Sequence, residues 1–199
     1  MNILDFKSSE KNSKIFPIII TVIFFVVCSY ITLIIDNPTQ DADLLYYFFA
    51  GKQILAGDGE NVQIVNGPIG WPVVLASINY LFDDPHITAK TISLIFSSGI
   101  VFLTYPILRN VFDKKTAILG QILISTHPFL HLEAIMTHSE MLPTFLIFVA
   151  IYFLTKKQIQ SSDIMLCGVF LGLSFMFRPQ SLLIGIGVIF TLLISFKRK

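Results

Sequence analysis

The chain has 199 residues, of which 54% are hydrophobic and only 14% are charged, and its formal net charge is +1. Soluble domains are usually about 25% charged, so this composition excludes an ordinary soluble protein and predicts an integral membrane protein. The near-zero net charge offers no basic surface, which excludes a nucleic-acid-binding module. The two cysteines, Cys28 and Cys167, both lie in apolar segments and predict no disulfide framework.

The first apolar run extends from Ile15 to Ile35. As a helix, its roughly 21 residues cover about 30 Å, the thickness of the hydrocarbon core of a bilayer. Three lysines precede the run, and no small-residue cleavage site follows it. We therefore expect an uncleaved first membrane span rather than a signal peptide.

Two carboxylates, Asp41 and Asp43, follow this span closely. They are expected where lipid headgroups meet water, a position that suits chemistry between a lipid-borne substrate and a water-borne acceptor, whereas a helix start needs only one acid. Apolar or small residues then recur at helical spacing: Leu44, Phe48, Gly51 and Leu55. This pattern predicts an amphipathic helix that lies along the membrane surface.

Five later apolar runs are also expected to cross the membrane: Ile87–Leu108, Thr116–Leu132, Met141–Leu154, Ile164–Phe177 and Ser181–Phe196. A further run, Pro68–Phe82, has only about 15 residues, too few for an upright span. With this run kept on the outer face, most basic clusters fall on one side, which the positive-inside rule makes cytoplasmic. The prediction is an all-α polytopic protein, a single module over residues 1–199 with six spans and both termini in the cytoplasm, most simply in the cell membrane.

This topology places the first loop, residues 36–86, on the outer side together with two shorter loops, 133–140 and 178–180. The polar candidates for a site all emerge on that side: Asp41, Asp43, Glu133, His138, Glu140 and Arg178. The sequence therefore predicts a site at the outer membrane surface.

Five segments, taken together in their order along the chain, resemble the GT-C type of polytopic glycosyltransferase, which uses polyprenyl-phosphate-linked sugars. This type includes protein O-mannosyltransferases, aminoarabinose transferases and the catalytic subunits of oligosaccharyltransferase. The segments are DLLYYFFAGKQILAG (Asp43–Gly57), GPIGWP (Gly67–Pro72), LRNVFDKK (Leu108–Lys115), the stretch from Pro128 to Glu140, and GVFLGLSFMFRPQ (Gly168–Gln180). Asp43 matches the acid of the family's first outer loop, Glu140 its second acidic position, and Arg178 its basic residue before a proline.

The resemblance implies sugar transfer from a polyprenyl phosphate to a glycan, lipid or protein acceptor. Asp43 is expected to orient or deprotonate the acceptor hydroxyl, with Asp41 as the alternative or as a partner that raises the pKa of its neighbour. Arg178 is expected to bind the lipid phosphate, and Glu140 the acceptor or a metal. A divalent cation, Mg²⁺ or Mn²⁺, would be held by Asp43 and Glu140. Substrate contacts are also expected from two aromatic residues, Tyr47 and Trp71.

Each of these residues also has a structural explanation. Asp41 can cap a helix, Glu140 can stabilise a first helical turn, and Arg178 can extend to lipid headgroups. Tyr46, Tyr47 and Trp71 fit an aromatic belt at the membrane interface. Three histidines, His127, His131 and His138, suggest a metal site, and the first two have helical spacing. No second pair of metal ligands accompanies that pair, so the sequence disfavours a zinc site.

Members of the family usually carry more spans than the six expected here. We therefore expect a fragment, a split gene product, or a minimal form that needs a partner subunit for the missing helices. The alternative function is a non-catalytic carrier of lipid-linked sugar, a flippase-like transporter or an assembly subunit. A transporter should show inverted repeats and ionisable residues at midplane. The polar residues instead concentrate at the ends of the spans, which favours the enzyme.

Overall fold

The computed structural model describes residues 3–34, 42–59 and 68–197, and these residues form nine α-helices and no strand. The helices are α1 (Ile3–Ile34), α2 (Ala42–Leu55), α3 (Gly70–Asn79), α4 (Pro85–Val111), α5 (Lys114–Ser125), α6 (Pro128–Ile135), α7 (Met141–Thr155), α8 (Ser161–Phe177) and α9 (Ser181–Lys197). The predicted all-α class is confirmed.

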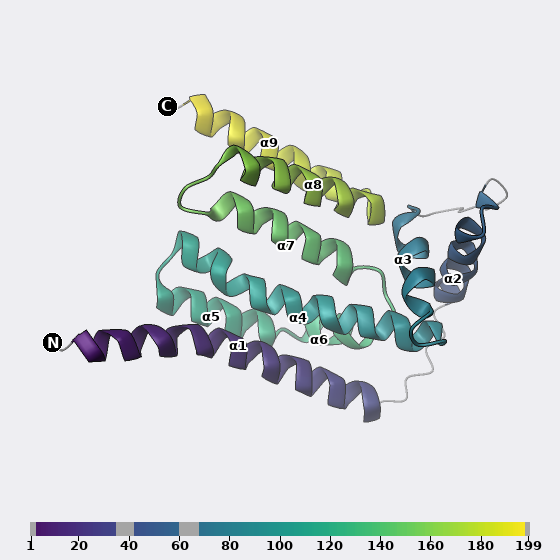
Figure 1. Ribbon diagram of the computed structural model, residues 1–199, viewed down its shortest axis with the longest axis horizontal. Coiled ribbons are helices and arrows are strands. Elements are labelled where there is room, and N and C mark those ends of the chain that lie inside the picture. The colour runs from purple at the N-terminus through teal and green to yellow at the C-terminus, as the bar shows by residue number, and fades with distance from the viewer. Residues whose placement is uncertain (1–2, 35–41, 60–67, 198–199) are drawn as a thin grey trace.

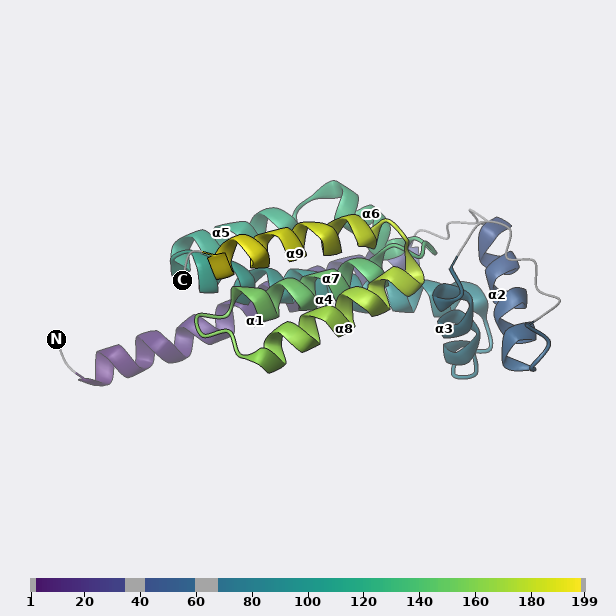
Figure 2. The same cartoon turned by 90° about the horizontal axis from the view of Figure 1, so that it is seen from above.

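The long helices form a bundle in which α1, α4, α5, α7, α8 and α9 run along one common axis, while α2 and α3 lie across one end (Figure 1). The view from above shows the same separation (Figure 2). Helix α4 lies at the centre and packs against α1, α5, α6 and α7. The end covered by α2 and α3 is called the α3 end below.

The outside of the bundle is apolar. In the described part, Ile15–Ile34 of α1 and Pro85–Val111 are long and apolar enough to cross a membrane, and α7, α8 and part of α9 are shorter apolar helices. Large apolar side chains remain exposed on the outer helices, among them Ile23 on α1 and Leu183 on α9. A surface of this kind is stable in hydrocarbon rather than in water, because water disfavours contiguous apolar area. The chain is therefore a helical membrane protein.

The expected single span Thr116–Leu132 is in fact two helices, α5 and α6, joined at Thr126 and His127. Helix α6 begins at Pro128, which is the first helical residue. Proline is tolerated at that position because its missing N–H would have no helical partner there, but its ring obstructs a helix that continues from the preceding residues. The proline therefore ends the span that hydrophobicity alone would continue.

One apolar face of α2 packs against the neighbouring helix α3. Leu44 and Phe48 are buried in a cluster that includes Trp71 and Leu75 of α3, whereas Leu55 is exposed. Gly51 sits at the closest approach, because a Cβ atom there would lie only 2.0 Å from the carbonyl oxygen of Pro72. Helices α2 and α3 thus form one packed pair.

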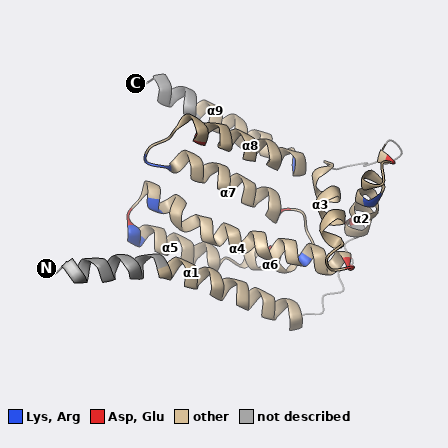
Figure 3. Cartoon of the chain, viewed as in Figure 1, with Lys and Arg blue, Asp and Glu red and all other residues tan. Residues whose placement is uncertain are grey.

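Basic residues gather at the opposite end of the bundle, in the connections from α4 to α5 and from α7 to α8 (Figure 3). In the first connection, the Thr116 hydroxyl and the Lys115 backbone N–H donate to the carboxylate of Asp113 and hold its pKa below the usual value. In the second, Lys156 pairs with Asp163 at 2.6 Å and lowers the pKa of that carboxyl. Both connections are therefore ordered by ionised groups.

Candidate functional site

Four separate segments meet at the α3 end: the start of α2, the start of α3, the connection from α6 to α7, and the end of α8. They enclose a pocket of about 230 Å³, called the acidic pocket below. Its lining residues are Asp43, Leu44, Tyr47, Trp71, Thr137, His138, Ser139, Glu140 and Arg178. Among them are five residues to which the sequence assigned a role: Asp43, Tyr47, Trp71, Glu140 and Arg178.

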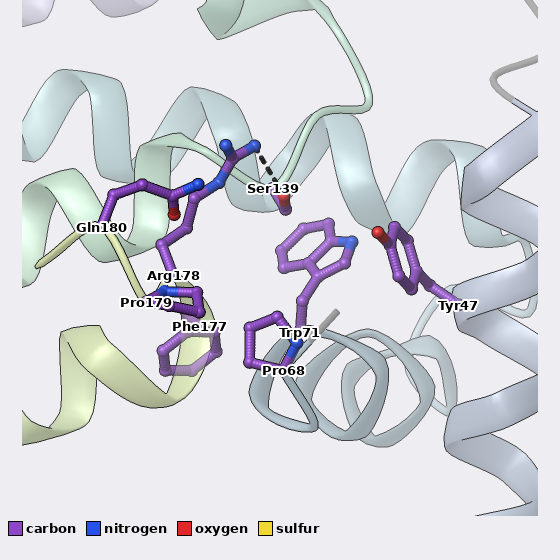
Figure 4. A pocket seen from close by; sticks show the side chains of 8 residues that line it. All are labelled: Tyr47, Pro68, Trp71, Ser139, Phe177, Arg178, Pro179 and Gln180. Atoms are coloured by element: carbon purple, nitrogen blue, oxygen red, sulfur yellow. Dashed lines mark hydrogen bonds between the residues drawn. The ribbon is translucent and has the colours of Figure 1, made fainter. Parts of the chain in front are cut away.

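A smaller pocket of about 140 Å³ adjoins the acidic pocket and shares four of its lining residues with it (Figure 4). Trp71 stands between Arg178 and Tyr47 in this view, and Pro68 lies beside it. The Trp71 side chain is buried, so its indole forms a fixed wall for both pockets. Aromatic side chains held in this way offer a rigid apolar face to a ligand.

Asp43 lies in the first turn of α2, with an exposed side chain at the rim of the acidic pocket. The next residue, Leu44, is buried against α3 and fixes the orientation of this turn. Tyr47, one turn further along, lines both pockets. Asp41, the other first-loop acid, lies outside the described residues.

Arg178 follows the last turn of α8, where Pro179 prevents the helix from continuing. Its backbone N–H donates to the carbonyl oxygen of Ser174 at 2.9 Å. The guanidinium forms an ion pair with Glu140 and donates from Nη2 to the Ser139 hydroxyl at 3.3 Å (Figure 4). The Arg178 side chain remains 37% exposed, so a ligand in the pocket can reach it.

Glu140 immediately precedes α7, yet its side chain makes no capping hydrogen bond to that helix. One carboxylate oxygen, Oε1, pairs with Arg178. The other, Oε2, is buried and has no hydrogen-bond partner among the described residues. A buried carboxylate oxygen without a partner is costly, so Glu140 holds unused binding capacity.

Glu133 and His138 form a second polar pair next to Glu140. Glu133 is only 5% exposed, and its Oε2 lies 3.1 Å from Nδ1 of His138. The hydroxyl of Ser93 on α4 donates to the His138 carbonyl oxygen at 3.2 Å and holds this connection in place. The sequence placed both residues in the outer loop, gave Glu133 no role and considered His138 only for a disfavoured zinc site, because nothing in a spacing of five residues across a helix end indicates their contact.

Glu133, His138 and Glu140 together provide three possible metal ligands, whose donor atoms lie within 4.8 Å of one another. Asp43, an expected metal ligand, lines the same pocket but is not in this group. His127 and His131 are not in the group either; the His131 ring packs edge-on against Phe24. Two carboxylates and an imidazole suit a cation such as Mn²⁺.

A third cavity, of about 160 Å³, begins at Glu140 and Arg178 and continues between α7 and α9, where Pro143, Ile147 and Ile184 line it. This cavity is called the α7–α9 groove below. The Ser174 hydroxyl donates to the Pro143 carbonyl oxygen at 3.0 Å and bonds Ser181 at 2.7 Å, which ties α7, α8 and α9 together beside the groove. The α7–α9 groove thus has a charged end at Glu140 and Arg178 and an apolar remainder between the helices.

Comparison with known proteins gives one result. Residues 66–199 match the family model described as dolichyl-phosphate-mannose-protein mannosyltransferase. The matched segment includes Trp71, Glu140 and Arg178, and Asp43 precedes it. The searches of curated proteins and of solved structures find no match.

Proposed function

The chain belongs to the dolichyl-phosphate-mannose-protein mannosyltransferase family of GT-C-type membrane glycosyltransferases, and we propose that it transfers a sugar from a polyprenyl-phosphate donor to an acceptor on the outer membrane face. One observation carries the proposal: Asp43, Glu140 and Arg178, from three separate segments, line a single pocket at one end of an apolar bundle. Transfer of a sugar from a phosphate requires a carboxylate that accepts the proton of the acceptor and a cation that stabilises the departing phosphate, and a carboxylate and a guanidinium both line this pocket.

We assign the donor to the side of the pocket formed by Arg178. A guanidinium can bind phosphate through two parallel hydrogen bonds, and it stabilises the negative charge that develops on the departing phosphate. The α7–α9 groove begins at Arg178 and is lined by apolar side chains, which suits the isoprenoid chain. The phosphate and the chain of one donor can thus occupy adjoining cavities.

The acceptor is assigned to the side formed by Asp43. Its carboxylate accepts the proton of the acceptor hydroxyl as that oxygen bonds to the anomeric carbon and the bond from this carbon to phosphate oxygen breaks. The polyprenyl phosphate then leaves with the bonding electrons. Tyr47 and Trp71 line both pockets and offer aromatic faces to the sugar.

A divalent cation is a proposed cofactor. The sequence suggested Asp43 and Glu140 as its ligands, and the grouping of Glu140 with Glu133 and His138 supports these three as the ligand set. The imidazole favours Mn²⁺ over Mg²⁺. When bound, the cation would supply positive charge next to the phosphate-binding side of the pocket.

The competing function is a carrier that moves the lipid-linked sugar without transferring it. Vesicles containing the purified chain, alone and with candidate partner subunits, should be supplied with a polyprenyl phosphate carrying a labelled sugar. We expect label in a glycan, lipid or protein acceptor, together with release of polyprenyl phosphate. Movement of intact donor across the bilayer without labelled product would contradict the transferase and support the carrier.

We propose that the α3 end faces outward and that the basic connections lie in the cytoplasm, as the positive-inside rule predicts. Cysteines introduced at Gly59 and Gln180 should react with an impermeant maleimide added outside intact cells, and a cysteine at Lys115 should react only after permeabilisation. The native Cys28 and Cys167 are buried and should give little background. Equal labelling at Gly59 and Lys115 from outside would contradict this topology.

A further inference from the structure

Glu140 lies between two groups that can each use its carboxylate. On one side is Arg178, paired with Oε1. On the other side are Glu133 and His138, whose ligand atoms lie within 4.8 Å of each other and of Glu140. Because Oε2 of Glu140 has no hydrogen-bond partner in the described part of the chain, the present pairing uses only half of the carboxylate.

We propose that donor phosphate and a divalent cation bind cooperatively because they exchange partners at Glu140. The donor phosphate binds the guanidinium of Arg178 in place of Glu140. The released Glu140 carboxylate then coordinates the cation together with Glu133 and His138. The inference rests on the proposed function in one respect, namely that the anion at Arg178 is the phosphate of the donor.

The contacts of Arg178 support the first half of this exchange. Both of its side-chain contacts, to Glu140 and to Ser139, use Nη2. Nη1 and Nε make no hydrogen bond to the residues that the structure describes, so they are available to an anion in the pocket. A phosphate that binds the guanidinium through two parallel hydrogen bonds competes directly with the single carboxylate oxygen of Glu140.

The charges around the pocket support the second half. Asp43, Glu133 and Glu140 contribute three carboxylates, against one guanidinium from Arg178. A bound phosphate increases this excess of negative charge. Because the phosphate occupies Arg178, Glu140 then lies near Glu133 without the guanidinium as its ion-pair partner. Two carboxylates this close repel each other in a partly buried site unless a cation or a proton intervenes. A divalent cation restores the balance.

Cooperative binding of this kind is reciprocal: if phosphate tightens the binding of the cation, the cation tightens the binding of phosphate by the same factor. The competing explanation is a permanent Arg178–Glu140 ion pair that only holds α8 against the start of α7. A permanent pair predicts independent binding of the two ligands. The two explanations therefore differ in a quantity that can be measured without any sugar transfer.

The experiment measures Mn²⁺ binding to the purified full chain in detergent, by the electron paramagnetic resonance signal of free Mn²⁺. The probe is a short isoprenyl monophosphate, which has no sugar to transfer, and the corresponding isoprenyl alcohol is the control ligand. We expect the phosphate, but not the alcohol, to tighten Mn²⁺ binding by about fivefold or more, within the usual range of coupling between two sites.

Two variants separate the exchange from simple attraction between Mn²⁺ and phosphate. Arg178→Gln should release Glu140 permanently, so that Mn²⁺ binds tightly with or without the probe. Glu140→Gln should weaken Mn²⁺ binding and remove its response to the probe. Lys90→Gln removes a positive charge near the start of α4, at a residue that does not line the pocket, and should behave as wild type.

Mn²⁺ affinity that ignores the phosphate probe would overturn the exchange, as would the absence of Mn²⁺ binding or a coupling that persists in Arg178→Gln. Circular dichroism of each variant checks that the helices are intact, and the wild-type measurement is decisive by itself if a variant fails to fold. A chain that transfers sugar but shows no coupling overturns only this inference. A coupled chain that transfers no sugar, either alone or with the candidate partner subunits, overturns only the proposed function.

Discussion

Asp43→Asn is expected to lower sugar transfer by about two to four orders of magnitude, the usual range for loss of a general base. Asparagine keeps the size of the side chain and still favours the start of a helix, but it cannot accept the proton of the acceptor hydroxyl. The packing of α2 should survive, because Leu44 and Phe48 are buried against α3 whereas Asp43 is exposed. The measurement is the initial rate of labelled product formation at equal protein abundance in the membrane.

Asp83→Asn is the matched control for this change. Asp83 is also exposed at the α3 end, and its backbone φ of 54° is one that asparagine adopts readily. Transfer by this variant should equal that of the wild type. Asp41→Asn should cost less than Asp43→Asn; the reverse order would shift the correspondence with the family by two residues. If neither change matters in an assembly shown to be active, the catalytic role of this loop is wrong.

Arg178→Ala is expected to weaken donor binding by about ten- to a hundredfold, because hydrogen bonds to a charged group contribute about 1.5–3 kcal/mol. Arg178→Lys keeps the charge but loses the planar two-point geometry, so it should recover only part of the affinity. Both variants should fold, since the Arg178 and Glu140 side chains are about one-third exposed and water can hydrate the carboxylate that remains. Equilibrium binding of the intact donor in the absence of acceptor gives the affinity.

Arg109→Lys provides the matched control for the lysine variant. Arg109 lies in the last turn of α4 at the opposite end of the bundle, where its guanidinium reaches the carbonyl oxygen of Phe112 at 3.4 Å. The change should leave donor affinity unaltered. Unchanged affinity in both Arg178 variants would mean that Arg178 only anchors the end of α8 at the lipid headgroups.

The residues of the acidic pocket show how far the sequence alone can go. Resemblance of short segments to a family assigned roles to Asp43, Tyr47, Trp71, Glu140 and Arg178, and all five line the same pocket. This was possible because Glu140 and Arg178 lie at the ends of apolar helices that pack side by side, while Asp43, Tyr47 and Trp71 belong to the long loop that the sequence placed at the same face. Their chemical roles remain predictions.

Contacts between side chains were beyond the reach of the sequence. Arg178 and Glu140 are 38 positions apart, and only the packing of α7 against α8 brings them together. The contact of Glu133 with His138 depends on the turn after α6, which Ser93 of α4 holds in place. Such contacts follow from the relative positions of helices, which hydrophobic periodicity does not encode.

Composition, the lengths of the apolar runs and the order of short motifs are local properties, so the sequence by itself determined the helical membrane class, the family and several of the segments that line the acidic pocket. Only the tertiary structure decided which neighbouring surface covers the apolar face of each helix. The stripe of Leu44, Phe48 and Gly51 fits a lipid surface and a neighbouring helix equally well. Helix α3 covers it because Gly51 allows the backbone of Pro72 to approach, a contact between segments that periodicity along α2 cannot reveal.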